Sequence, residues 1–320
     1  MSIPHRLGRR IAIKASACLL ALTMLSAMGF HARAEPLRLL NEHGPGSWDL
    51  GRSSGYKACE SALTLTACRV GAWSDASPAP YKRWLQPAST PMALPDRNSE
   101  PEVQWRFNGQ VKNIADYMNE VQLTGLLILK NGEVVAERYQ YGRQPGMPMR
   151  SFSMAKTITA LLVGMAHQKG FISSLDDPVS KYWPEIAESA YGQTSVRALL
   201  RMSSGVPYKE LYTWTPDDDN AAWGTLLYHP ANRGRKDLLE RFLKQRTQRE
   251  VNAGERFHYA SIETDILGRV LVRATGRSGA ELTQEWIWQP MGAEHPAYWN
   301  TAAIDGAEAF AGGFNASLRD

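Results

Sequence analysis

One helical pattern constrains the fold of this chain more than any other feature of its 320 residues. It starts at Ser153-Met154-Ala155-Lys156 and ends at Lys169-Gly170, where a basic last turn is followed by a glycine. Between these points, apolar residues recur at the spacing of one helical face: Ile158, Leu161, Leu162 and Met165. The pattern predicts an amphipathic helix with a serine and a lysine at its N-terminal end.

The serine and the lysine of this helix suggest chemistry. Residues three positions apart on a helix share a face, so the Ser153 hydroxyl and the Lys156 amine are expected side by side. A lysine amine held out of water can lose its proton near neutral pH and then accept the proton of a serine hydroxyl. The spacing therefore predicts acyl transfer, with Ser153 as the nucleophile. The alternative role for Ser153 is an ordinary helix N-cap.

The same spacing occurs a second time, at Ser54-Gly55-Tyr56-Lys57. Here a glycine follows the serine at once, and the next marked feature is the pair Cys59 and Cys68 rather than a helical pattern. Two common residues at a fixed spacing recur by chance, so the context decides between the copies. Ser54 is interpreted as the chance match.

The first 34 residues have the pattern of an export signal. An apolar run over residues 15–30 is followed by Ala32-Arg33-Ala34, whose small residues suit signal peptidase, and it is preceded by Arg6, Arg9, Arg10 and Lys14. We expect cleavage and a periplasmic or secreted protein without a stable membrane anchor. An uncleaved anchor is the alternative, although the apolar run is shorter than the roughly 20 residues of a bilayer span. The sequence leaves the export route open, since Arg9-Arg10 also resembles a twin-arginine signal.

Cysteine usage fits an oxidising compartment. Cys18 lies in the expected signal, which leaves Cys59 and Cys68 as a pair, and a disulfide between them is predicted. No histidine or carboxylate accompanies the two cysteines at ligand spacing, so no metal site is expected. The composition is that of a folded globular protein, with 43% hydrophobic and 21% charged residues and a net charge of +4. It gives no indication of a nucleic-acid partner.

Prolines divide the chain. Six of them fall between residues 78 and 101, where they exclude helix interiors and central strands: Pro78, Pro80, Pro87, Pro91, Pro95 and Pro101. Residues 35–105 are therefore interpreted as an N-terminal appendage that ends in an extended connector. Residues 106–320 are interpreted as the main domain.

Within this domain, Asn131-Gly132 lies between two apolar runs and predicts a tight hairpin with strands at residues 126–130 and 133–138. A helix is predicted at residues 112–121, packed on the hairpin, with Tyr117 interpreted as a core residue.

A tyrosine is the third candidate for the site. Tyr259-Ala260-Ser261 lies 106 residues after Ser153 and leads into a second helical pattern. A phenol near an ammonium group has a stabilised phenolate and can relay a proton to a leaving group. Tyr117 and Tyr298 stand in similar Tyr-x-Asn patterns but rank behind Tyr259. His258 is interpreted as structural.

Four motifs occur in the order found in serine β-lactamase-like and penicillin-binding-protein-like hydrolases, which the chain resembles. They are Ser153-Met154-Ala155-Lys156, the segment from Asp177 to Tyr182, the segment from Val196 to Gly205, and Tyr259-Ala260-Ser261. Residues 257–268, 288–292 and 312–320 resemble the 6-aminohexanoate-dimer hydrolase and esterase branch. The resemblance covers about residues 110–320.

The resemblance implies an α+β fold of the β-lactamase/transpeptidase type, with a central antiparallel sheet flanked by helices and a mostly helical lobe. It implies a serine hydrolase that cleaves a small amide or ester through an acyl-enzyme, without a metal or organic cofactor. In that chemistry Ser153 attacks the carbonyl, Lys156 activates the serine, and Tyr259 protonates the leaving group. A D-alanyl-D-alanine carboxypeptidase or a β-lactamase is the alternative with the same chemistry.

Two further residues are expected to bind substrate. Ser261 stands where penicillin-recognising members usually carry asparagine, which disfavours β-lactamase activity, and Tyr212 resembles a substrate-loop tyrosine. The acidic loop Asp217-Asp218-Asp219 is a candidate for attracting an amine-bearing substrate. Its alternative interpretation is a solvated acidic turn with packed aromatic residues.

The C-terminal residues 312–320 are interpreted as a turn followed by the start of a new helix. The family's third element, a strand with a Lys-Thr-Gly or His-x-Gly pattern, would follow Asp320, so we expect a chain truncated at its C-terminus. A frayed terminus is the alternative. Without that strand an oxyanion donor is lost, so a non-catalytic binding protein or an inactive remnant is the rival class. The sequence does not determine the oligomeric state.

Overall fold

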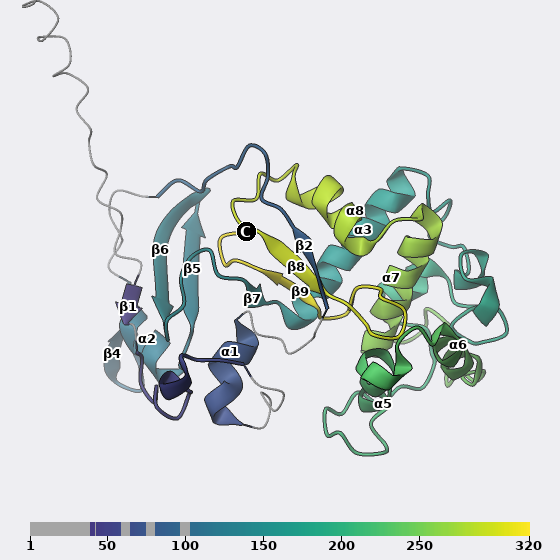
Figure 1. Cartoon of the computed structure of the whole chain (residues 1–320), viewed down its shortest axis with the longest axis horizontal. Coiled ribbons are helices and arrows are strands. Elements are labelled where there is room, and N and C mark those ends of the chain that lie inside the picture. The colour runs from purple at the N-terminus through teal and green to yellow at the C-terminus, as the bar shows by residue number, and fades with distance from the viewer. Residues whose placement is uncertain (1–38, 42, 59–64, 75–80, 97–102) are drawn as a thin grey trace, which may run out of the picture. The chain divides into compact units, whose positions relative to one another are not determined.

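The computed structural model describes residues 39–41, 43–58, 65–74, 81–96 and 103–320, and these described residues belong to one compact unit (Figure 1). The predicted export signal, residues 1–34, lies outside the described residues. Cys68 is disulfide-bonded, but Cys59 is not among the described residues, so their pairing stays a prediction. Within the described ranges, no helix has both the length and the apolar character needed to cross a bilayer.

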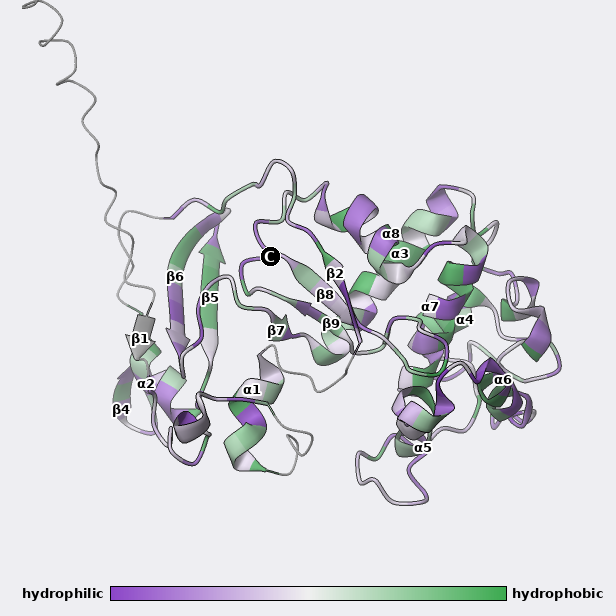
Figure 2. Cartoon of the chain, viewed as in Figure 1, coloured by the Kyte–Doolittle hydropathy of each residue, from purple (hydrophilic) through white to green (hydrophobic). Residues whose placement is uncertain are grey.

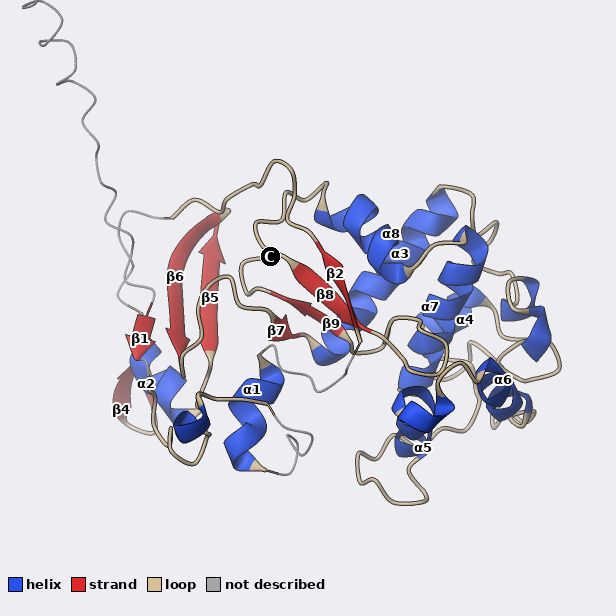
Figure 3. Cartoon of the chain, in the orientation of Figure 1, coloured by secondary structure: helices blue, strands red, loops and turns tan. Residues whose placement is uncertain are grey.

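The strands of the described residues form three sheets (Figure 3). The first has the order β1-β6-β5, the second β2-β8-β9-β7, and the third is the hairpin β3-β4. Except for the parallel pair β1-β6, the strands pair antiparallel. Their bounds are β1 Leu39–Asn41, β2 Lys82–Leu85, β3 Gln104–Phe107, β4 Gln110–Asn113, β5 Gly125–Lys130, β6 Glu133–Gln140, β7 Met149–Arg150, β8 Ala297–Asn300 and β9 Phe314–Ala316.

Helices pack beside the four-stranded sheet and form the lobe beyond it (Figure 1). Their bounds are α1 Arg69–Trp73, α2 Ile114–Glu120, α3 Ala155–Gln168, α4 Val196–Leu200, α5 Asp219–Tyr228, α6 Lys236–Lys244, α7 Ser261–Thr275 and α8 Gly279–Thr283. Short 3-10 turns and one π-helical segment, Gln284–Trp288, complete the described elements. The predicted α+β class is confirmed.

The helices α3 and α7 form the centre of the fold. Leu162, Val163, Ile266 and Val270 are fully buried between their neighbours. A Cβ at Gly268 would lie 1.9 Å from the Phe310 ring, so a glycine lets the loop before β9 approach α7 closely. The predicted helix after Ser153 is confirmed. It ends before Gly170, and this glycine adopts a left-handed φ of 81°.

The predicted hairpin is also confirmed. Asn131 and Gly132 have φ values of 55° and 80°, as a type I′ turn requires, and Lys130 pairs with Glu133 across it. Figure 2 shows that β5 is largely hydrophobic, yet most of its residues are only half-buried, and β5 is an edge strand of its sheet. In α2, the helix before the hairpin, Met118 faces the core and is fully buried, whereas Tyr117 is 42% exposed. The interpretation of Tyr117 as a core residue is wrong.

The predicted appendage contributes to the main sheet. β2 pairs with β8 over all four of its residues, and the backbone N–H groups of Ala88 and Met92 donate to the carbonyls of Ala293 and Gly292. The structure thus places the described part of residues 35–105 in the same compact unit as the rest. The prolines did not exclude this, since β2 occupies the proline-free interval between positions 80 and 87.

One prediction near the C-terminus is wrong. Residues 314–316 form strand β9 rather than the start of a helix, and Asn315 pairs with Tyr298 of β8. Tyr298 is fully buried in that strand. A three-residue strand is too short to show the alternation by which strands are predicted, and its pairing partner is distant in sequence.

Candidate active site

A strained turn presents Ser153 to solvent at the start of α3. Phe152, a non-glycine residue, adopts a left-handed φ of 46° and opens the 3-10 turn Phe152–Met154. The backbone N–H and the hydroxyl of Ser151 both donate to the Phe314 carbonyl, at 3.1 and 2.8 Å. Strand β9 therefore holds the turn that positions the serine, and strain of this kind often marks functional sites.

The three predicted catalytic residues meet at one oxygen atom. Lys156 Nζ donates to Ser153 Oγ at 3.1 Å, and Tyr259 Oη donates to the same oxygen at 2.8 Å. Lys156 Nζ also lies 5.1 Å from the centre of the Tyr259 ring and donates to the carbonyl of Ala311 at 2.8 Å. Ser153 is exposed and Tyr259 is 38% exposed, so the cluster is open to a substrate.

The motif around α4 places Tyr259. The backbone N–H of His258 donates to the Met202 carbonyl at 2.7 Å, and that of Ala260 contacts Met202 Sδ at 3.3 Å. Gly205, with φ of 76°, lets this segment approach the backbone at Val251, because a Cβ at position 205 would lie 2.1 Å from the Val251 carbonyl oxygen. The His258 ring contacts the Tyr208 carbonyl at 2.6 Å, in keeping with the structural role predicted for it.

The two predicted substrate-binding residues meet at a carboxylate that the prediction missed. Ser261 donates to Glu210 through both its backbone N–H and its hydroxyl, each at 2.7 Å. Tyr212 also donates its hydroxyl to Glu210, while the tyrosine is 63% exposed. Desolvation and the Glu210 carboxylate raise the pKa of Tyr212. Ser261 therefore anchors the loop of Tyr212, and its side chain is engaged before any substrate binds.

The acidic loop has a structural role in this arrangement. Asp218 is buried and accepts hydrogen bonds from the backbone N–H groups of Thr213 and Trp214, at 2.9 and 3.2 Å, while it caps α5. Asp219 forms an ion pair with Arg246 at 3.3 Å. The alternative of a solvated turn with packed aromatic residues holds only in part, since Asp217 is exposed but Asp218 is buried and Trp214 is 64% exposed. Attraction of an amine-bearing substrate stays a prediction.

The buried carboxylate of Asp265 is linked to Lys156 through the backbone of Ala311. Asp265 on α7 accepts hydrogen bonds from the Trp223 indole at 2.8 Å and from the backbone N–H of Ala311 at 3.1 Å. The carbonyl of the same Ala311 accepts from Lys156. Burial raises the pKa of Asp265, and the guanidinium of Arg269 opposes this shift. Sequence patterns gave no signal for this residue, because its partners lie 42 and 46 positions away.

Among the described residues, the second Ser-x-x-Lys copy shows no comparable cluster. Ser54 Oγ donates to the Gly51 carbonyl at 2.9 Å within a 3-10 turn, which agrees with its interpretation as a chance match. In the part of the chain that the structure describes, histidine, cysteine, aspartate and glutamate side chains do not gather in groups of three that could hold a metal ion.

The chain is similar in sequence to two proteins named as hydrolases. The 6-aminohexanoate-dimer hydrolase of Paenarthrobacter ureafaciens is 27% identical over 269 residues, which are 78% of this chain and 64% of that protein. Esterase EstB of Burkholderia gladioli is 27% identical over 195 residues, or 55% of this chain and 47% of the esterase. The chain thus spans less than two thirds of the length of either relative.

The fold agrees with these similarities. A solved structure from Bacillus anthracis, provisionally named a 6-aminohexanoate-dimer hydrolase, superposes with a TM-score of 0.63 at 22% identity, covering 75% of this chain and 63% of its own. The sequence profile described as Beta-lactamase matches residues 111–318, which include the serine, the lysine and the tyrosine of the cluster. The chain therefore belongs to the Beta-lactamase family, as its sequence motifs predicted.

Proposed function

We propose that the protein is an exported serine hydrolase that cleaves an amide or an ester through an acyl-enzyme formed on Ser153. Proteins with this fold that resemble the chain include an esterase and a 6-aminohexanoate-dimer hydrolase. One observation carries the proposal: Ser153 Oγ accepts hydrogen bonds from both Lys156 Nζ and Tyr259 Oη. A nucleophile that contacts a base and a second proton carrier is the arrangement that acyl transfer needs.

In the proposed mechanism each residue has one step. When the Lys156 amine is neutral, it takes the Ser153 proton as Oγ bonds to the substrate carbonyl carbon. Tyr259 gives its proton to the leaving nitrogen or oxygen as the bond to the acyl group breaks, and Lys156 restores the Tyr259 proton. Water then attacks the acyl-enzyme, and its proton returns along the same groups to Ser153 Oγ.

A backbone donor is available for the developing negative charge. The N–H of Ser153 lies at the start of the turn before α3, where intrahelical acceptors are missing, and it makes no hydrogen bond with another described residue. An N–H in this position can donate to the carbonyl oxygen of a substrate bound at Oγ.

A fluorophosphonate probe tests the nucleophile, since it labels activated serines. We expect labelling of the purified protein and its loss in Ser153→Ala. The matched control is Ser54→Ala, which removes the serine of the other Ser-x-x-Lys copy and should label normally. Labelling that persists in Ser153→Ala would refute the assignment, and an unlabelled wild-type chain would favour a non-catalytic binding protein.

Two substrates separate the possible activities. We expect turnover of a short-chain nitrophenyl ester, because the two hydrolase relatives and the engaged Ser261 side chain favour the aminohexanoate-dimer hydrolase and esterase branch. Durable labelling of Ser153 by a tagged penicillin would instead favour a D-alanyl-D-alanine carboxypeptidase or a β-lactamase.

Export rests on the sequence of the first 34 residues. We expect the mature protein to be recovered outside the cytoplasm with Glu35 as its first residue. Sequencing of its N-terminus checks this, and an intact Met1 in the exported fraction would contradict cleavage.

A further inference from the structure

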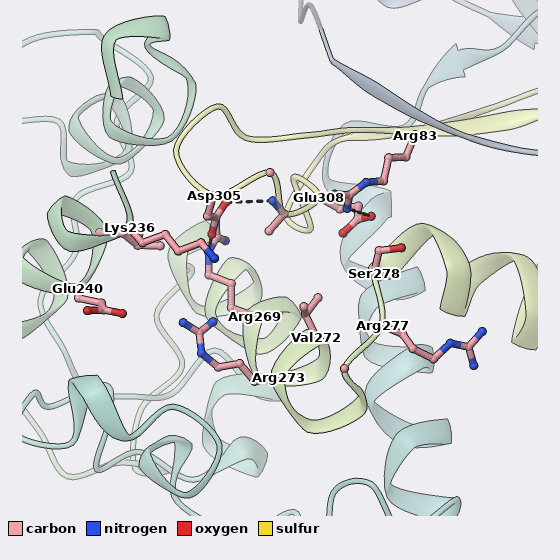
Figure 4. Close-up of a pocket in the computed structure, with 14 residues that line it drawn as sticks. Arg83, Lys236, Glu240, Arg269, Val272, Arg273, Arg277, Ser278, Asp305 and Glu308 are labelled. Atoms are coloured by element: carbon pink, nitrogen blue, oxygen red, sulfur yellow. Dashed lines mark hydrogen bonds and ion pairs between the residues drawn. The ribbon is translucent and has the colours of Figure 1, made fainter. Parts of the chain in front are cut away.

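A basic cavity lies between α6, the second half of α7 and the residues that precede α8 (Figure 4). Its volume is about 520 Å³, within the size range of small-molecule sites. None of Ser153, Lys156 and Tyr259 lines it. Its charged lining residues are Arg83, Lys236, Arg269, Arg273 and Arg277 on the basic side, and Glu240, Asp305 and Glu308 on the acidic side.

Most of these charges are already paired. Arg269 forms an ion pair with Asp305 at 2.8 Å, and Arg83 forms one with Glu308 at 2.7 Å. Arg277 pairs with a carboxylate outside the cavity, that of Glu285, at 2.6 Å.

Two cations are left over. Neither the Lys236 ammonium nor the Arg273 guanidinium forms an ion pair or donates a hydrogen bond to another described residue. Once these pairs are counted as neutral, the lining keeps two positive charges, Lys236 and Arg273, and one negative charge, Glu240, which is an excess of one positive charge.

Arg273 is the more informative of the two. Its guanidinium lies over the ring of Trp183, 4.1 Å from the ring centre, and because Trp183 is fully buried this cation–π contact holds the guanidinium in place. Burial lowers the pKa of Arg273, but an arginine stays charged in proteins. A half-buried guanidinium whose N–H groups lack acceptors is unfavourable unless a ligand or water supplies them. Its planar fork matches the two oxygens of a carboxylate or a phosphate.

Lys236 faces the same space from another element. Figure 4 shows its side chain reaching from α6 towards Arg269 and Asp305, with the Arg273 guanidinium below it. Two carboxylates act on Arg273 from beyond ion-pair distance: Glu185, which lies outside the cavity lining, and more weakly Glu240, which lies to one side of the cavity. The negative charge of Glu240 repels an anionic ligand from that side of the cavity. An anion is therefore attracted most strongly between Lys236 and Arg273.

We propose that this cavity binds a small organic dianion, with one acidic group on the Arg273 guanidinium and further negative charge on the Lys236 ammonium. A dicarboxylate and a phosphate monoester share this chemistry, since each brings two negative charges and several acceptor oxygens. The site is separate from the Ser153 cluster, and the proposal does not depend on the hydrolase activity.

Titration calorimetry of the full chain at low ionic strength tests the proposal with succinate and inorganic phosphate as probes, and with acetate as the monoanion control. We expect saturable binding of one probe per chain, weakened about tenfold or more in Lys236→Gln and in Arg273→Gln. Lys244→Gln removes the same charge at the other end of α6, outside the cavity, and should bind normally. Tighter binding of succinate indicates a dicarboxylate ligand, and tighter binding of phosphate indicates a phosphate ester.

Lys236 is exposed, so Lys236→Gln keeps the test decisive if loss of the Trp183 stacking prevents Arg273→Gln from folding. The proposal is overturned if neither probe binds saturably. It is equally overturned if Lys244→Gln weakens binding as much as Lys236→Gln, because the attraction would then be a property of the whole surface.

Discussion

Residues 259–269, which lead into and along α7, differ sharply in exposure from one end to the other. Tyr259, just before α7, is 38% exposed and reaches Ser153 by a single hydrogen bond. Glu263, Asp265 and Arg269, within the following two to three turns, are each 3% exposed or less and contact several groups. The groups proposed to meet a substrate are thus exposed and make few contacts, while the charged residues that follow them in the chain are enclosed by the fold.

This difference separates activity from stability. The exposed cluster loses little packing when a side chain is changed, so substitutions there should reduce turnover and leave the fold intact. The buried charges have lost their hydration, so substitutions there leave uncompensated polar groups and should lower the free energy of unfolding. The following predictions test this separation, beginning with the largest expected effect.

Lys156→Ala should have the largest effect on turnover. It removes the base that contacts Ser153 Oγ, and loss of one member of such a cluster typically costs about 10⁴ to 10⁶ in rate. We expect kcat for a nitrophenyl ester to fall in that range, with only a small change in thermal stability. Lys244→Ala, an exposed lysine on α6, is the control. Normal activity in Lys156→Ala would show that the observed contact has no catalytic role.

Tyr259→Phe should have a smaller effect that depends on the leaving group. General acid catalysis contributes about 10²–10⁴ to rates, and it matters most when the leaving group is a poor one. We therefore expect an amide substrate to lose more activity than a nitrophenyl ester, whose leaving group departs without a proton. The exposed Tyr117 stands in a similar motif, so Tyr117→Phe is the control. Equal losses for both substrates would argue against proton donation by Tyr259.

The meeting of Ser153, Lys156 and Tyr259 could be predicted because its signals are local. Helix periodicity placed Ser153 and Lys156 on one face, and a helical pattern follows Tyr259 but not Tyr298. The hairpin at Asn131-Gly132 was equally local, since both residues accept the left-handed conformation.

The supporting contacts could not be predicted, because they join residues far apart in sequence. Ala311 lies 155 positions from Lys156, and Glu210 lies 51 positions from Ser261. A carboxylate two residues before Tyr212 is the one local feature that could have drawn attention to Glu210, but it does not identify the partner.

Asp265→Ala tests the buried end of the comparison. The change leaves the Trp223 indole, the Ala311 N–H and part of the positive charge of Arg269 without their partner. Removal of one member of a buried polar network costs about 3–5 kcal/mol, so we expect the free energy of unfolding in urea to fall by that amount. Asp217→Ala, in the exposed part of the acidic loop, is the control. A change below about 1 kcal/mol would show that Asp265 is solvated or dispensable.

Glu263 should make the free energy of unfolding depend on pH, and this effect should be smaller than that of Asp265→Ala. Its carboxylate accepts a hydrogen bond from Ser204 Oγ at 2.6 Å, but its second oxygen is buried and has no partner among the described residues. Burial raises the pKa of Glu263 to about 7, partly opposed by the hydrogen bonds from Ser204.

A raised pKa means that the folded state binds a proton that the unfolded state has released, so stability falls as the pH rises between about 4.5 and 7. The free-energy difference across this window is at most about 3 kcal/mol. Glu263→Gln keeps a neutral group of the same shape, so we expect its unfolding free energy to change less between pH 5 and pH 8 than that of the wild type. Glu188→Gln, at an exposed position, should retain the wild-type slope. If the unfolding free energy of all three proteins changed equally with pH, Glu263 would be charged in the folded state throughout this range. The surroundings of Glu263 in α7 would then be better solvated than its contacts indicate.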